Sequence, residues 1–110
     1  MAKGTYIQKG EIIDYTNSSG AAIEYGDVVP LVSRIGIAAE NIPIGITGSL
    51  KTEGIYELPA VNNAAFAVGD PLYWDGAAGN LTKTATGTIL AGWCVEAKAT
   101  ATTVGKVKIG

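Results

Sequence analysis

The chain of 110 residues contains no histidine, the commonest general base and metal ligand in proteins. A Ser-His-Asp or Cys-His catalytic arrangement therefore cannot form, and zinc sites built from cysteine and histidine are excluded. Glycine is abundant, but no G-x-x-x-x-G-K-[ST] phosphate loop occurs. These absences predict a protein that is not an enzyme and that uses no metal and no cofactor.

Cysteine is almost as rare, because Cys94 is the only one. No disulfide can form within the chain, and the apolar setting of Cys94 in AGWCVEA predicts a buried, unreactive thiol. Long apolar runs are also missing, and the first residues, MAKGTYIQKGEIID, contain no stretch typical of a signal sequence. We therefore expect the protein to be made and kept in the cytoplasm, or in something assembled there, with no membrane partner.

Charged residues make up 16% of the chain, against about 25% in an average soluble domain. The lysine and arginine residues are scattered singly, so no basic patch is expected and nucleic acid is not an expected partner. The many Gly, Ala and Thr residues predict a surface with few charged groups and mostly small side chains. Such a surface is often covered by other copies of the protein or by a partner.

Short runs of β-branched, aromatic and other apolar residues recur between glycines, and no stretch keeps the spacing of an amphipathic helix. This pattern predicts an all-β fold, with strands at residues 11–16, 27–33, 36–38, 44–50, 54–59, 70–74, 81–82, 88–97 and 104–109. One short helical turn is expected within residues 61–69, where Asn62 or Asn63 can cap an alanine-rich segment.

A short pattern occurs twice, as IEYGDVV and as FAVGDPL. Glycine tolerates positive φ, and aspartate can hydrogen-bond a nearby backbone amide. We therefore expect Gly26-Asp27 and Gly69-Asp70 to form tight structural turns that lead into strands. Metal or phosphate binding by Asp27 and Asp70 is the alternative interpretation.

Later glycines can be aligned in the same order, among them Gly45 with Gly92. Loops absorb insertions at little cost, so an alignment whose spacing drifts still indicates a structural repeat. The chain is therefore interpreted as an N-terminal arm, residues 1–9, followed by one β domain, residues 10–110. Within that domain we expect two pseudo-repeated β units, at about residues 23–59 and 66–110.

The expected strand at residues 88–97 has apolar residues on both of its alternating faces, and the segment IPIGITGSL shares this property. Strands of this kind are expected to be buried on both faces, in a closed barrel, a sandwich or a contact between subunits. The expected fold class is therefore all-β, as a small barrel or β-sandwich built from the two units, with a flexible N-terminal arm.

Six strings occur in an order that resembles a known family: QKGEIIDYTNSSGAAIEYGDVVPL, IGIA, TEGIYELP, AFAVGDPLYWD, LAGWCVEA and GKVKIG. Together they resemble the successive blocks of the capsid cement, or head decoration, proteins of tailed phages, from about residue 6 to residue 110. One departure is Glu11, where the family pattern has Asp after Gly10; the charge is preserved.

The resemblance implies a structural protein on the exterior of an icosahedral virion head, made in the bacterial host cytoplasm. Such a protein is usually a homotrimer at threefold and quasi-threefold positions, where it clamps neighbouring major capsid protein subunits after expansion. The implied partners are the major capsid protein and other copies of the chain.

The N-terminal arm is the candidate capsid-binding segment, through Lys3, Thr5, Tyr6 and Ile7. The arm is expected to be loose in solution and to add a strand to the capsid protein, or to pack on it, when bound.

The alternative function is a carbohydrate- or cell-surface-binding module displayed on the virion. It would use Tyr73, Trp74 and the loop at residues 75–88, since aromatic rings can stack on sugars. No basic groove is expected around these aromatic residues, so packing in the core or at an interface is the simpler interpretation of them.

Overall fold

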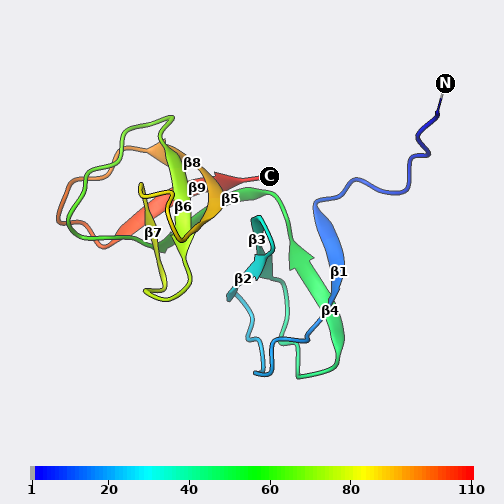
Figure 1. Ribbon diagram of the computed structural model, residues 1–110. Coiled ribbons are helices and arrows are strands. Elements are labelled where there is room, and N and C mark those ends of the chain that lie inside the picture. Colours follow the sequence, from blue (N-terminus) through cyan, green and yellow to red (C-terminus); the bar gives the residue numbers. More distant parts are fainter. Residues whose placement is uncertain (1) are drawn as a thin grey trace.

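The computed structural model describes residues 2–110, and within them the chain forms nine strands and no helix (Figure 1). The strands are β1 (Ile12–Thr16), β2 (Val28–Leu31), β3 (Arg34–Ala38), β4 (Thr47–Lys51), β5 (Gly54–Pro59), β6 (Pro71–Asp75), β7 (Asn80–Thr82), β8 (Ile89–Glu96) and β9 (Val104–Ile109). The described residues therefore include no helix that is long and apolar enough to cross a membrane. The all-β prediction is confirmed, because β-branched and aromatic runs alternate with glycine-containing turns along the whole chain.

All ladders between these strands are antiparallel, and they form two sheets. The four-stranded sheet has the order β1-β4-β3-β2, and the five-stranded sheet has the order β5-β9-β8-β6-β7. Figure 1 shows the two sheets beside each other, with the chain passing between them once, from β4 to β5. The β-sandwich prediction is confirmed.

The closed-barrel alternative is wrong, because the strands divide between two sheets and neither sheet closes on itself. The five-stranded sheet does curl strongly. Ala60, just beyond β5, forms an isolated parallel bridge with Leu81 of β7. This single bridge brings the two ends of the sheet together without making a ladder between them.

The apolar core has two parts. The larger part lies under the five-stranded sheet, where Leu72, Leu81 and Val107 are completely buried. Ile35 and Ile37 of β3 join this part, so one strand of the four-stranded sheet contributes to the core of the other sheet. The smaller part consists of Ile23, Val29, Ala38, Ile42 and Leu50, all from the first half of the chain. Burial of β3 against the five-stranded sheet is therefore what joins the two sheets.

The prediction that the strand at residues 88–97 is buried on both faces is wrong, because two bulges interrupt the alternation of its side chains. Leu72 and Tyr73 of β6 pair with Gly92 and Leu90, which leaves Ala91 as an extra residue. A second register shift follows Cys94. As a result Ala91 and Cys94 are both buried, although they lie three residues apart, whereas Leu90 and Trp93 are 49% and 44% exposed.

Two other local predictions are wrong. Residues 61–69 contain no helix; the chain bends at residues 62–63, Phe66 forms an isolated antiparallel bridge with Lys98, and the Gly-Asp turn follows. The strand expected at residues 44–50 begins only at Thr47. The preceding residues form a turn in which Gly45 has a φ of 79°, and Ile44 and Ile46 are exposed.

Candidate functional site

The two Gly-Asp turns have the same geometry. Gly26 and Gly69 have φ values of 86° and 94°, in the region that favours glycine. The Asp27 carboxylate accepts a hydrogen bond from the Glu24 amide at 2.9 Å, and the Asp70 carboxylate accepts one from the Ala67 amide at 2.8 Å. Both carboxylates therefore hold the backbone of their own turn.

The backbone bonds around the turns also match, but not in the alignment expected from sequence. The Gly26 amide donates to the Ala38 carbonyl, and the Gly69 amide donates to the Cys94 carbonyl, at 2.8 Å in each case. In this pattern β3 corresponds to β8. The alignment of Gly45 with Gly92 is wrong, since Gly45 lies in a turn and Gly92 lies inside β8. More chain separates Gly69 from β8 than separates Gly26 from β3, because β7 and its flanking loops lie between β6 and β8.

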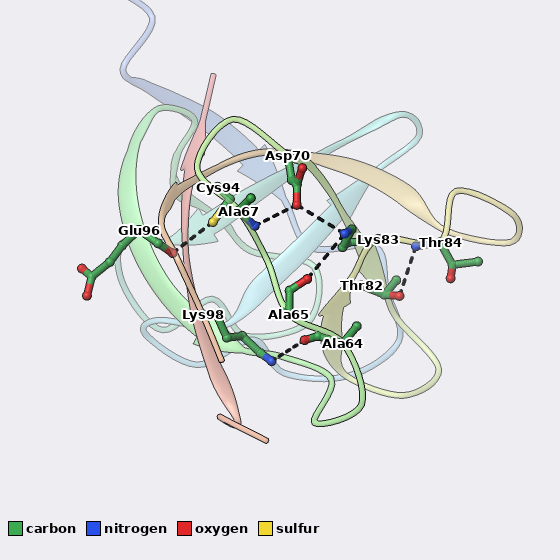
Figure 2. Close-up of polar contacts among 10 residues, drawn as sticks. All are labelled: Ala64, Ala65, Ala67, Asp70, Thr82, Lys83, Thr84, Cys94, Glu96 and Lys98. Atoms are coloured by element: carbon green, nitrogen blue, oxygen red, sulfur yellow. Dashed lines mark hydrogen bonds and ion pairs between the residues drawn. The ribbon is translucent and has the colours of Figure 1, made fainter. Parts of the chain in front are cut away.

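Asp70 has a second contact, an ion pair of 3.4 Å with Lys83 (Figure 2). The Ala67 amide, followed by Lys83, lowers the pKa of Asp70 below the ordinary value of 3.8. Within residues 2–110, no three acidic or cysteine side chains gather as a metal site would require. The geometry of Asp27 and Asp70 is thus that of turn residues.

Cys94 is completely buried, and its thiol donates to the Glu96 carbonyl at 3.1 Å (Figure 2). Burial keeps this thiol away from solvent and from other reactive groups, which fits an unreactive cysteine.

Lys98 is a residue whose role the sequence did not reveal, because it was grouped with the scattered surface lysines. Its side chain is buried, and its Nζ donates to three carbonyls: Ala64 at 2.7 Å, Ala99 at 2.9 Å and Thr100 at 3.1 Å. The same nitrogen lies 4.9 Å from the centroid of the Phe66 ring. Figure 2 shows the Lys98 side chain pointing toward Ala64, with the hydrogen bond between them. Lys98 therefore joins two loops that are distant in sequence.

The N-terminal arm extends away from both sheets (Figure 1). Its described residues, 2–9, have no regular secondary structure and are all exposed; Met1 lies outside the described residues. Lys3 and Thr5 are exposed, and Tyr6 and Ile7 are 79% and 80% exposed. The arm is attached to the body at its base, where the Thr52 amide donates to the Glu11 carbonyl and the Thr52 hydroxyl donates to the Gly10 carbonyl.

The outer face of the five-stranded sheet combines apolar and charged residues, since Glu57, Lys106 and Glu96 lie in register on it beside a row that contains large apolar side chains. Four residues on neighbouring strands lie opposite one another across it, in the order Ile55, Lys108, Trp93 and Pro71. Of these, Ile55 is 62% exposed and Trp93 is 44% exposed. Cross-strand neighbours in register lie on the same face of a sheet, so these side chains form a continuous stripe.

The aromatic pair expected to serve a sugar-binding module is divided between the two faces of β6. Trp74 is buried in the larger core, where it pairs across the sheet with Leu81. Tyr73 lies on the opposite face and is half-buried. Adjacent strand residues point to opposite faces, so Tyr73 and Trp74 cannot form one stacking platform.

Comparison with protein families identifies what kind of protein has this arrangement. The model of the phage cement protein family matches residues 7–109. Searches of curated proteins and of solved structures returned no match. The family is one of structural proteins, and its description implies association with the capsid in the virion. Because the match spans nearly the whole chain, the protein belongs to the phage cement protein family.

Proposed function

We propose that the protein binds the outer surface of the expanded phage capsid and stabilises contacts between neighbouring major capsid protein subunits. The observation that supports this most directly is the apolar surface left uncovered in the isolated chain. The outer stripe of the five-stranded sheet, with Ile55 and Trp93, and the arm, with Tyr6 and Ile7, all expose large apolar side chains. Exposed apolar patches of this kind mark surfaces that bind other proteins.

The arm is the proposed first point of attachment. It directly precedes β1, which is an end strand of the four-stranded sheet and so leaves one edge unpaired. An extended segment beside such an edge can pair with a strand of another chain, so main-chain hydrogen bonds supply affinity. Lys3, Thr5, Tyr6 and Ile7 then contact the capsid protein with their side chains.

Cementing follows from mass action. A protein that binds the expanded lattice and not the unexpanded one stabilises the expanded state by the difference in binding free energy. In a homotrimer, three arms bind neighbouring capsid subunits together, and each modest contact is strengthened by the high local concentration of the others.

The test is to mix the purified protein with expanded and with unexpanded heads and to measure co-sedimentation. The expected result is binding to expanded heads alone, and decorated heads that open at a higher temperature than undecorated heads. Equal opening temperatures with the protein bound would refute cementing, and absence of binding to expanded heads would refute the capsid as the partner.

A further inference from the structure

The tip of the β2–β3 hairpin is strained. Leu31 pairs with Arg34, so Val32 and Ser33 form a two-residue connection. Val32 has a φ of 34°, the one positive φ of a non-glycine residue within the described part of the chain. The left-handed region is unfavourable for β-branched side chains, and hairpin tips of this length are normally Asn, Asp or Gly.

Val32 gains nothing within the isolated chain that offsets this strain. Its side chain is fully exposed, so no packing of the apolar group stabilises the conformation. Strained residues persist at sites where the conformation serves another purpose, such as contact with a ligand or partner. An apolar, strained and fully exposed tip is therefore a candidate contact point.

A groove adjoins this hairpin. It has a volume of about 430 Å³ and lies between the two sheets. Its lining comes from the hairpin, through Leu31 and Arg34, and from β8, through Leu90 and Trp93. Leu90 and Trp93 are about half-exposed, so the groove is apolar and open to a partner. Val32 follows Leu31 at the hairpin tip, directly after the part of the hairpin that lines the groove.

The two charged side chains that line the groove are both basic. Arg34 and Lys108 line it, and no aspartate or glutamate side chain is among its lining residues. Within residues 2–110, neither Arg34 nor Lys108 takes part in an ion pair. An arginine without a partner beside an apolar groove is suited to a carboxylate, which it can bind through two parallel hydrogen bonds.

We propose that the Val32 tip and this groove bind an extended segment of the capsid protein that carries an apolar side chain next to a carboxylate. This proposal rests on the function proposed above and names the chemistry of the partner. The arm of a second copy fits less well, because Lys3 and Lys9 would meet Arg34 and Lys108 with like charge.

The test measures stability and head binding for the same variants. Val32→Asn relieves the strain, so Tm should rise by about 4 °C while the affinity for expanded heads falls about tenfold or more. Arg34→Gln should weaken binding and reduce its dependence on salt concentration. Ile44→Asn is the control, because Ile44 is an exposed apolar residue beyond the opposite end of β3 and lines no part of the groove.

The outcomes separate the two proposals. The proposed surface is supported if the wild-type protein and Ile44→Asn bind expanded heads equally well and Val32→Asn binds them weakly. If the wild-type protein binds heads and Val32→Asn binds them with the same affinity, this inference is wrong, but the proposed cement function is not affected. If Val32→Asn instead dissociates an oligomer and free protomers bind heads normally, the surface joins copies of the chain and the inference is wrong. If the wild-type protein binds no heads, the cement function fails, and the inferred partner fails with it.

Discussion

Replacing Lys98 with methionine tests how much the buried ammonium group of this lysine contributes to the stability of the fold. Methionine keeps the length and apolar character of the side chain but removes its nitrogen. Three carbonyls, of Ala64, Ala99 and Thr100, then lose the donor that now lies 2.7 to 3.1 Å away. The Phe66 ring also loses the cation above its face.

The expected magnitude follows from these contacts. A hydrogen bond to a charged group contributes about 1.5 to 3 kcal/mol, and a cation–π contact contributes about 0.5 to 1 kcal/mol or more. These contributions do not simply add. Methionine also avoids the cost of burying a charged group, which offsets part of the lost stability. We expect a net destabilisation of about 3 kcal/mol, which for a domain of this size lowers Tm by roughly 12 °C or more.

Urea unfolding and thermal unfolding, both followed by tryptophan fluorescence, measure the changes in free energy of unfolding and in Tm, since Trp74 is buried and reports on the core. Lys83→Met is the matched control. Lys83 donates to the Ala65 carbonyl at 3.4 Å and pairs with Asp70, but its side chain is 47% exposed. Exposed pairs contribute little, so its Tm should stay within about 2 °C of wild type. If Lys98→Met is no less stable than Lys83→Met, the reasoning about the buried lysine is wrong.

Three further predictions concern other parts of the chain. Gly92→Ala should destabilise the folded protein by about 3 kcal/mol or reduce its soluble expression, because an added Cβ would lie 1.9 Å from the Lys108 carbonyl oxygen. Gly76→Ala is the control and should leave stability unchanged, since an added Cβ there would meet no neighbouring atom within 4 Å. Because the pKa of Asp70 is lowered in the folded state, its carboxylate contributes stability that is present above the ordinary pKa of 3.8 and is lost as the pH falls below it. Asp70→Asn should therefore show a smaller fall in Tm between pH 6 and pH 3 than wild type. An equal fall would contradict this. Deleting residues 2–9 should leave Tm unchanged and weaken binding to expanded heads about tenfold or more, and unchanged binding would exclude the arm as a capsid contact.

Two of the strand predictions failed because local irregularities of the backbone leave little signal in the sequence. The sequence predicts a strand where apolar and β-branched residues cluster, but it does not reveal where a bulge adds a residue. One extra residue, Ala91, moves Leu90 and Trp93 to a face where they are partly exposed. The prediction that the strand begins at residue 44 was wrong because Ile44 and Ile46 have strand propensity, but Gly45 between them turns the chain.

Of the two candidate binding surfaces, the sequence predicted the N-terminal arm but not the groove between the sheets. The arm was visible in the sequence as a short polar segment with two large apolar residues, and the structure leaves it exposed. The groove was not visible, because Leu31 and Arg34 come from one sheet whereas Leu90 and Trp93 come from the other. Lys98 was not distinguished from other lysines, since its carbonyl partners are supplied by two loops and backbone acceptors leave no signal in sequence.

The sequence by itself determined the all-β class, the approximate places of the strands and the absence of histidine-based chemistry. These depend on local residue preferences and on composition, which need no knowledge of the fold. Only the tertiary structure decided which apolar residues are buried, because burial depends on sheet pairing, bulges and the packing of β3 under the other sheet. The groove beside the Val32 tip exists only after the two sheets meet, since its lining comes from the β2–β3 hairpin and from β8, which are distant in sequence.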